Sequence, residues 1–465
     1  MADLSAWLGG SPHATAIETH DGRVWDYATL AAEIDERARA AETVAGTLAS
    51  RVLAITAKDD LTLLLGVLVA WRLDATPWLV GTSSASVAQV GPAAFFGDEG
   101  PQRAGGTRAL EAGLVLTTSG STGTPKHVVL EHAGLSANVD AILGYLPVMD
   151  APRTGVLVPL SYGYGLVGQA LTTLRAGGTL LLLRGASAFA AQQRDALLRF
   201  RAQGLSSVPT QLRALCELGP LDLRYVASAG APLDAATAEA MRRACPNARR
   251  FNQYGLTEAS PRVSALEDVD DPEAFLRGGI GSPLEGVELR TDADEEHSAE
   301  LFVRGPNVMR EYLDDPEGTR AVLDAEGWLR TGDRVFRDAR GRLFPAGRAD
   351  DVVKVAGERV SLVRVGAAFE DAGECVVCAV PSPRSGLKLV AFVVGDLARA
   401  RTIARSLPDA WRPSKLVGLA SLPKTERGKV DHALLRSWAV TGGPTDAGND
   451  VGDVEARAPS EGRSE

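Results

Sequence analysis

Residues 116–126 read LTTSGSTGTPK, directly after the apolar run AGLV at residues 112–115. The small residues of this stretch let backbone N–H groups approach an anion, its hydroxyls are further donors, and Lys126 carries a positive charge. These are the properties of a phosphate-binding loop. The stretch is not a Walker A loop, GxxxxGK[ST], because Pro125 precedes the lysine and His127 follows it. Taken alone, it fits a polar turn between two strands equally well.

Apolar runs and longer helical segments alternate on both sides of this loop. Three short apolar runs predict strands at residues 51–57, 155–160 and 178–185. Two longer segments, residues 59–72 and 194–204, predict helices. Such alternation is typical of an α/β fold with largely parallel sheets.

After Ile280 the sequence changes to short strands separated by turns, which favours an antiparallel β subdomain. We therefore predict three parts. Residues 1–347 form a large α/β core with this β subdomain, residues 348–440 form a small α+β domain, and residues 441–465 form a disordered acidic tail. The tail carries six acidic residues against two arginines and has little that a core could bury.

Charge and composition exclude several classes of protein. The formal net charge of −10 argues against nucleic acid or an anionic membrane as a partner, since both attract a basic surface. The most apolar segment, Leu61–Trp71, is too short to span a bilayer, so we expect a cytoplasmic protein. Four cysteines are too few for a disulfide framework, and apolar neighbours predict that Cys375 and Cys378 lie on a buried strand.

Six further segments form an ordered series with the opening loop. They are VPLSYGYGLVGQ (158–169), YVASAGAPL (225–233), FNQYGLTEAS (251–260), GWLRTGDRVFRDARGRL (327–343), GRADDVVKVAGERVS (347–361) and LPKTERGKVDHALLR (422–436). Together with LTTSGSTGTPKHVVLEH (116–132), this series resembles the motifs of the adenylate-forming (ANL) superfamily, in particular its AMP-dependent acyl/aryl-CoA synthetases. The resemblance implies a large N-terminal α/β domain and a small mobile C-terminal α+β domain.

The resemblance also implies a reaction in two steps. A carboxylic acid and ATP give an acyl-adenylate and pyrophosphate, and a thiol then takes the acyl group. Lys429 is implied to reach the α-phosphate and the carboxylate, where its charge stabilises the transition state. Glu258 is implied to bind Mg²⁺, a hard ion that prefers carboxylate oxygen, and Thr257 to contact the α-phosphate.

The remaining nucleotide contacts follow from the same motifs. The residues implied to hold the β- and γ-phosphates are Thr118, Ser119, Gly120, Ser121, Thr122, Gly123 and Lys126. Asp333 and Arg348 are implied to contact the ribose. The residues implied to enclose the adenine are Tyr254 and Gly255 on one side and Gly230, Ala231 and Pro232 on the other.

The small domain is implied to rotate about a hinge at Asp350. This rotation removes Lys429 from the site and presents the loop that contains Lys354 and Gly357 to the thiol cofactor. One active site then serves both steps. Relative to the usual pattern this domain is shortened, and it lacks the Pro-x-Glu-Ile-Glu stretch after residue 359.

The acid itself stays open. The residues implied to shape its pocket are Tyr162, Tyr164, Gly165 and Ser228. At Tyr162 many relatives carry a histidine, and His127 stands where glycine is usual. Residues 159–166 hold no acidic side chain to pair with an α-amino group, so we expect a non-amino carboxylic acid, aryl or acyl.

Three functions are compatible with these motifs. The acceptor is coenzyme A, or it is the phosphopantetheine thiol of a carrier protein that acts in trans, or the chain is an inactive ATP-binding homologue. Lys429, Glu258, Asp333 and Arg348 together favour an active enzyme.

Overall fold

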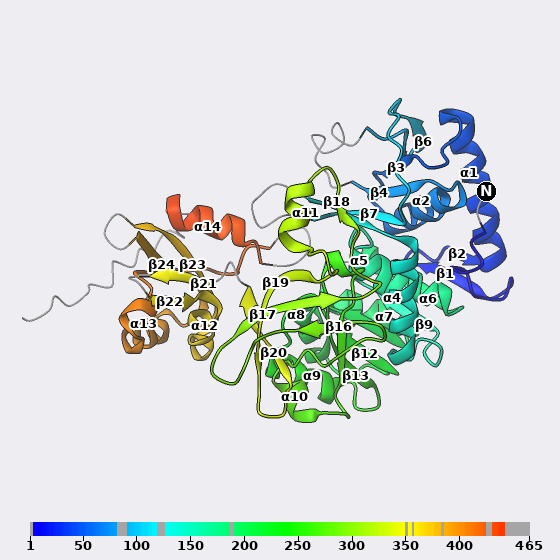
Figure 1. Ribbon diagram of the computed structural model, residues 1–465. Coiled ribbons are helices and arrows are strands. Elements are labelled where there is room, and N and C mark those ends of the chain that lie inside the picture. The colour runs from blue at the N-terminus through cyan, green and yellow to red at the C-terminus, as the bar shows by residue number, and fades with distance from the viewer. Residues whose placement is uncertain are drawn as a thin grey trace, which may run out of the picture. The chain divides into compact units, whose positions relative to one another are not determined.

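The computed structural model divides the chain into two compact units (Figure 1). The first comprises residues 1–331 and 336–345, and the second comprises residues 332–335 and 346–465. The residues that the structure describes are 3–80, 91–118, 126–186, 189–348, 352–355, 358–382, 386–424 and 430–441. The predicted disordered tail therefore lies outside the described residues, apart from Thr441.

A nine-stranded sheet forms one half of the first unit, in the order β15-β14-β13-β12-β11-β9-β10-β1-β2. Its strands are β1 (Thr15–Thr19), β2 (Val24–Asp26), β9 (Arg153–Val156), β10 (Thr179–Leu182), β11 (Gly204–Ser207), β12 (Tyr225–Ser228), β13 (Arg249–Tyr254), β14 (Ser264–Glu267) and β15 (Ser282–Pro283). The six central strands pair in parallel, and only the pairings toward β2, β14 and β15 are antiparallel. The predicted parallel sheet is confirmed.

A second sheet of seven strands has the order β18-β8-β7-β4-β3-β5-β6. Its strands are β3 (Val52–Ile55), β4 (Thr76–Leu79), β5 (Ala94–Gly97), β6 (Gly100–Arg103), β7 (Leu114–Thr118), β8 (Lys126–Leu130) and β18 (Glu311–Tyr312). Strands β7 and β8 are antiparallel neighbours, with Thr118 opposite Lys126. The opening loop thus connects two strands, as both of its interpretations required.

Helices surround these sheets. Those of the first unit include α1 (Tyr27–Ala45), α2 (Asp60–Arg72), α4 (His132–Tyr145), α7 (Ala190–Arg199), α8 (Pro209–Glu217), α9 (Ala235–Ala244), α10 (Pro272–Leu276), α11 (Pro316–Val322) and the short α5 (Gly163–Gly165) and α6 (Thr172–Arg175). A π-helical turn, Leu166–Leu171, joins α5 to α6. No helix in the described ranges is both long and apolar enough to cross a bilayer.

Helix α2 accounts for the most apolar run of the sequence. Asp59 begins the helix by accepting a hydrogen bond from the backbone N–H of Thr62. From Leu61 to Trp71, every residue except Thr62 is buried. A helix that is apolar on all sides must be buried on all sides. The prediction of a core helix is confirmed, since a single apolar cluster contains α2 together with residues of both sheets, such as Ile17 and Leu116.

The predicted helix at residues 194–204 is displaced. Helix α7 begins at Ala190 and ends at Arg199. Arg201 has a φ of 51°, in the left-handed region that a continuing helix does not allow. The predicted strand at 155–160 is likewise shifted to Arg153–Val156, and Pro159, which has no N–H to donate, stands beyond its end.

The short strands predicted after Ile280 form a four-stranded sheet in the order β16-β17-β19-β20. Its strands are β16 (Glu288–Arg290), β17 (Ala299–Arg304), β19 (Leu329–Arg337) and β20 (Leu343–Arg348). Strands β16 and β17 are antiparallel, as predicted. The boundary between the two units crosses this sheet, because residues 332–335 and 346–348 are assigned to the second unit.

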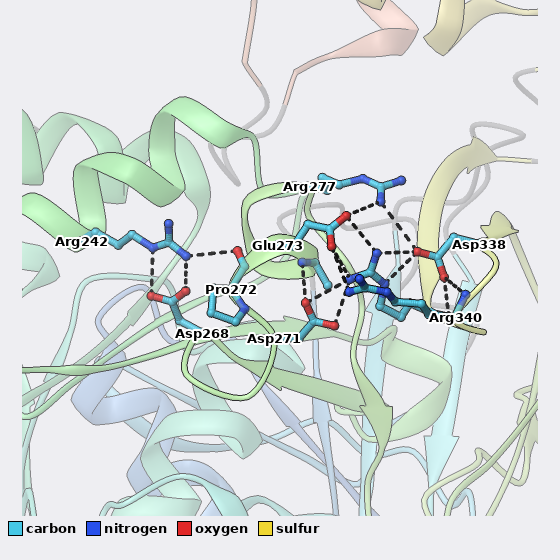
Figure 2. Close-up of polar contacts among 10 residues, drawn as sticks. Arg242, Asp268, Asp271, Pro272, Glu273, Arg277, Asp338 and Arg340 are labelled. Carbon is cyan, nitrogen blue, oxygen red and sulfur yellow. Dashed lines mark hydrogen bonds and ion pairs between the residues drawn. The ribbon is translucent and has the colours of Figure 1, made fainter.

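An ion-pair network fastens α10 to the turn between β19 and β20. Figure 2 shows the carboxylates of Asp271, Glu273 and Asp338 converging, and the guanidinium of Arg342 lies 3.1 Å from Asp271, 3.1 Å from Glu273 and 2.7 Å from Asp338. Hydrogen bonds from Arg342 hold the pKa of Glu273 and Asp338 below the ordinary range. Three carboxylates thus share one planar cation with several donors.

A neighbouring pair of arginines encloses one carboxylate. The Nε atoms of Arg242 and Arg250 donate to Asp268 at 3.0 and 2.8 Å, and the Asp268 side chain is only 5% exposed. Burial alone would raise the pKa of Asp268, but the hydrogen bonds from the two arginines outweigh it, so its pKa is lowered. Figure 2 shows Arg242 facing Asp268 and the Pro272 carbonyl together.

In its described residues, the second unit contains a hairpin, a three-stranded sheet and three α-helices. The hairpin is β21 (Val352–Val355) with β22 (Glu358–Ser361), and the sheet has the order β23-β24-β25. Its remaining elements are β23 (Gly373–Ser382), β24 (Gly386–Gly395), β25 (Lys415–Gly418), α12 (Leu362–Ala367), α13 (Leu397–Ser406) and α14 (His432–Thr441). Apolar clusters cover both faces of this sheet.

Strand β23 contains both cysteines of the CxxC sequence, as predicted. Because side chains alternate along a strand, Cys375 and Cys378 point to opposite faces. Cys375 packs with one apolar cluster and Cys378 belongs to the other, and neither cysteine forms a disulfide. They do not form a redox or metal-binding pair.

Asp268→Ala is expected to lower the free energy of unfolding by about 2–3 kcal/mol, because it leaves two partly buried guanidinium groups without their carboxylate. Chemical denaturation of the purified variant measures this. The matched control is Glu217→Ala, which removes an exposed partner of Arg213 on one helix face and is expected to cost less than about 0.5 kcal/mol. Equal costs for the two variants would show that burial of Asp268 adds nothing.

Candidate functional site

The candidate site lies at the carboxyl ends of the parallel strands in the nine-stranded sheet. Strands β11, β12 and β13 run in register, with Ser207 opposite Ser228 and Ser228 opposite Asn252. The segments that follow these strands therefore emerge at one edge. In open α/β sheets this edge is where ligands bind. The predicted adenine-side turn follows β12, and the predicted Thr–Glu motif follows β13.

The chain makes a tight turn directly after β13. Gly255 approaches the carbonyl of Pro261 so closely that a Cβ on Gly255 would lie 1.8 Å from that oxygen. Only glycine fits there, which explains the Tyr-Gly pair of the motif. Thr257–Ala259 then forms one turn of 3-10 helix, and Ser260 ends it in the left-handed region at a φ of 61°.

Two buried asparagines fix the main chain of this turn. The amide of Asn307 donates to the carbonyls of Ala259 at 3.0 Å and Arg262 at 2.9 Å. The amide of Asn138 donates to the same Arg262 carbonyl at 2.7 Å and accepts from the Arg262 N–H at 3.2 Å. Both asparagines are 1% exposed. Residues 259–262 are thereby held at both ends.

Glu258 is positioned through its side chain and its main chain. The hydroxyl of Tyr312 donates to Oε1 of Glu258 at 2.9 Å, and the N–H of Met309 donates to its carbonyl at 2.8 Å. The ammonium of Lys126 lies 4.3 Å from the centre of the Tyr312 ring, within the range of a cation–π interaction. A half-buried carboxylate, a phenol and a cation are thus gathered at one place.

Strand pairing explains why these three residues meet. Tyr312 on β18 lies opposite Val128 on β8, two residues after Lys126. Side chains two residues apart on a strand share a face, and diagonal neighbours are within reach of long side chains. The structure therefore brings Lys126, from the end of the opening loop, to the residue that holds Glu258.

His127 is a core residue. It is 8% exposed, its ring meets Trp78 edge-on with centroids 5.2 Å apart, and its Nδ1 lies 3.1 Å from the hydroxyl of Thr117. Burial lowers the pKa of His127, against a smaller opposing effect of Asp314. The residue that departs from the usual glycine thus packs inside the protein beside Trp78 and Thr117.

The predicted acid-side and adenine-side residues are also neighbours. Gly230 adopts a φ of 85° in an exposed turn, and a Cβ there would lie 3.8 Å from the ring of Tyr164. A Cβ on Gly163 would lie 3.3 Å from Pro261. The segment that contains Tyr162, Tyr164 and Gly165 therefore touches both the Gly230 turn and the turn after β13. Ala231 and Pro232 are exposed beside Gly230, and Ser228 is fully buried.

One residue of this region was missed from the sequence. Arg262 is 3% exposed, and its guanidinium carbon lies 4.3 Å from the centre of the Tyr164 ring. The available signal was an arginine in an otherwise uncharged run, ASPRVSAL, immediately after the Thr-Glu pair. Arginine is rarely buried unless it is paired, so its position alone does not predict burial.

The second unit holds two of the predicted ribose contacts. Arg348 lies 3.5 Å from the carboxylate of Asp333, and a Cβ on Gly332 would lie 2.8 Å from the same guanidinium. Gly332 has a φ of 73°, so the Thr-Gly-Asp motif requires its glycine for backbone conformation. Lys354 belongs to the hairpin strand β21.

The other predicted residues lie outside those that the structure describes. They are Ser119, Gly120, Ser121, Thr122, Gly123, Asp350, Gly357 and Lys429. Thr118, which borders the loop, is half-buried at the end of β7. The roles predicted for this group remain predictions.

Residues 81–313 match the family model described as AMP-binding enzyme. The chain belongs to this family. It is the adenylate-forming superfamily that the motifs indicated, and the α/β architecture agrees with it. Similar proteins include 4-coumarate–CoA ligase 3 of Arabidopsis thaliana, 30% identical over 348 residues, and the probable CoA ligase CCL5 of Humulus lupulus, 29% identical over 345 residues. Each match covers 69% of this chain and 62% of the relative, so the chain spans less than two thirds of these curated relatives.

Solved structures extend the comparison to nearly the whole chain. ATP-bound MatB from Rhodopseudomonas palustris has a TM-score of 0.82 at 22% identity, covering 93% of this chain and 98% of that one. At this identity it supports the fold. The amide bond synthetase McbA from Marinactinospora thermotolerans has a TM-score of 0.75 at 27% identity, covering 94% of this chain and 99% of that one.

The buried histidines are expected to make the protein less stable in mild acid. Burial lowers the pKa of His127 and of His132 in the folded protein, so the unfolded chain binds more protons below its histidine pKa of about 6.5. The free energy of unfolding therefore falls as the pH drops from 7.5 to 5.5. In His127→Gln this fall is expected to be smaller, because one of the two groups is gone.

Urea denaturation gives the free energy of unfolding at pH 7.5 and at pH 5.5. The difference between these two values is compared among variants, because it cancels any cost of the substitution that does not depend on pH. The control is His13→Gln at an exposed position, for which the wild-type difference is expected. A His127→Gln variant with the full wild-type fall would contradict the assignment of His127 as a buried neutral group.

Proposed function

We propose that this protein activates a non-amino carboxylic acid with ATP, giving an acyl-adenylate and pyrophosphate, and then transfers the acyl group to coenzyme A. The observation that carries the proposal is the group formed by Glu258, Tyr312 and Lys126, with a carboxylate, a phenol and a cation beside the carboxyl edge of the sheet. All three residues lie within the family match.

The chemistry of the first step explains this arrangement. A carboxylate oxygen of the acid attacks the α-phosphorus of ATP, the bond to the bridging oxygen breaks, and pyrophosphate leaves with that bonding pair. Two anions must meet, and negative charge builds up on the leaving group. To Lys126 and the hydroxyls of the loop that begins at Thr118 we assign, from the motif, the binding of the leaving pyrophosphate.

Glu258 is suited to a magnesium ion. Mg²⁺ is usually held by one or two carboxylates together with substrate phosphates. In the described part of the chain no three His, Cys, Asp or Glu side chains are grouped as a metal site. The ion would neutralise phosphate charge. Tyr312, through its 2.9 Å hydrogen bond, orients the Glu258 carboxylate that would hold the ion.

The remaining roles are carried over from the motifs. Lys429 stabilises the charge at the α-phosphate, Asp333 binds the ribose with Arg348 beside it, and Tyr254 and Gly230 enclose the adenine. For the second step we propose that the small domain turns about Asp350 and brings the loop of Lys354 and Gly357 toward the thiol. The plant relatives are named as CoA ligases, which supports coenzyme A as the acceptor.

An amine is the second candidate acceptor. The amide bond synthetase McbA is 27% identical to this chain and the match covers 94% of this chain, so it includes the small domain as well as the core. A carrier-protein thiol that acts in trans is the third candidate acceptor.

The first step is tested by substrate-dependent exchange of labelled pyrophosphate into ATP, with a panel of fatty, aryl and dicarboxylic acids. Lys429→Ala and Glu258→Gln are each expected to lower exchange by about 100-fold or more, because each removes charge compensation at the phosphates. Tyr312→Phe keeps the ring beneath Lys126 and loses only the hydrogen bond, so a loss of about 5- to 20-fold is expected. Exchange at the wild-type rate in Glu258→Gln would contradict the site.

The acceptor is tested with the acid that gives the strongest exchange. Coenzyme A, a phosphopantetheinylated carrier protein and a set of primary amines are added separately, and the products are identified by mass spectrometry. We expect the acyl-CoA thioester to form fastest. Lys354→Ala is expected to slow thioester formation at least about 10-fold while exchange stays within about 2-fold, because Lys354 acts only in the second step. An amide as the main product would favour the second candidate.

A further inference from the structure

Arg262 is a buried cation without a counter-ion. Its residue is 3% exposed, its Nε and Nη2 atoms have no hydrogen-bond partner, and it forms no ion pair with any residue that the structure describes. The other arginines considered above behave differently, since Arg242 and Arg342 each face carboxylates. A buried charge without a partner is strongly destabilising, so its retention requires a reason.

The guanidinium is held in one orientation from three sides. The ring of Tyr164 covers one face at 4.3 Å. Gly168 of the π-helical turn lies beside the Nη atoms of Arg262, since a Cβ on Gly168 would be 3.1 Å from Nη2. The hydroxyl of Tyr145 is also close: burial raises the pKa of Tyr145 to about 12, and the charge of Arg262 opposes this rise. The backbone of Arg262 is fixed by Asn138 and Asn307.

Further buried polar groups on the elements around this cation also lack partners. Both amide atoms of Gln169, which follows Gly168 in the π-helical turn, are buried without a hydrogen bond. Oε1 of Gln253 is also buried without a hydrogen bond, although Nε2 of the same residue donates to the Tyr145 hydroxyl at 2.7 Å. The hydroxyl of Tyr164 is buried without a partner as well. π-helical turns occur frequently at functional sites.

This cluster lies on the acid side of the candidate site. Tyr164 belongs to the segment that the motifs assign to the acyl pocket, and its ring borders the Gly230 turn. Arg262 follows Glu258 by four residues on the same turn, but the carboxylate of Glu258 is directed to Tyr312. The cation is therefore separate from the group that handles the phosphates.

The charge of the substrate decides which anion suits Arg262. The carboxylate that is activated becomes a neutral acyl group when it forms the mixed anhydride with AMP. A guanidinium paired with that carboxylate would lose its partner and be left buried and unpaired, which would oppose the forward step. A second anionic group elsewhere in the acid keeps its charge throughout the reaction.

We propose that Arg262, with Gln169 and Gln253, binds a second carboxylate of the substrate, so that the acid is a dicarboxylic acid. A planar guanidinium suits a carboxylate because it can form two parallel hydrogen bonds, here through the free Nε and Nη2. The amide groups of the two glutamines supply further polar contacts. This inference rests on the proposed function, since it names the class of acid that the same site activates.

The test uses pairs of acids that differ only by methyl against carboxylate: butyrate against succinate, and p-toluate against terephthalate. Pyrophosphate exchange of the full-length enzyme gives kcat/KM for each. We expect the diacid of at least one pair to be preferred by about 30-fold or more, the range of a buried charged contact. In Arg262→Met this preference is expected to vanish or reverse, mainly through KM, and Arg262→Lys is expected to restore part of it.

Arg153→Met is the matched control, because Arg153 pairs with Glu18 within the protein and is expected to change stability without changing the preference. Thermal unfolding with the diacid alone provides a second readout: the diacid raises the Tm of the wild type but not that of Arg262→Met. Exchange with monoacids and none with their diacid partners would overturn the inference and leave the proposed function intact. No exchange with any acid would overturn both.

Discussion

The hydrogen bonds from Asn138 and Asn307 to the main chain of residues 259–262 are the constraint on which the site depends. They close the turn after β13 and so fix the direction of two side chains, Glu258 before the turn and Arg262 at its end. Since both asparagines are buried, these bonds are shielded from competing water. The hydrogen bonds hold the turn in one conformation, which sets the positions of Glu258 and Arg262 relative to each other.

Much of this arrangement could be predicted from the sequence. The alternation of apolar and amphipathic segments indicated parallel sheets, and the fully apolar run of α2 indicated a core helix, because both patterns reflect burial. The motif residues Tyr254, Gly255 and Glu258 could be located by resemblance, and the structure gives a physical reason for one of them: no Cβ fits at Gly255 beside the Pro261 carbonyl.

Other features depend on contacts between distant segments and could not be predicted. The Tyr312 hydroxyl reaches Glu258 across 54 positions of sequence, through a strand pairing that no local pattern reveals. Arg262 resembles any surface arginine until its surroundings are known. Helix α7 ends at Arg199, earlier than the amphipathic pattern suggested. The left-handed backbone conformation of Arg201, which the pattern does not reveal, is incompatible with a longer helix.

Asn138 and Asn307 form hydrogen bonds only with backbone carbonyls and one backbone N–H. These bonds therefore do not depend on the side chain at position 262. A substitution there can alter what the acid end of the site accepts while the turn and the carboxylate four residues before it stay where they are. The turn and Glu258 are thus structurally independent of the side chain at position 262. In the proposed site, a single substitution at position 262 would therefore change the accepted acid without displacing Glu258.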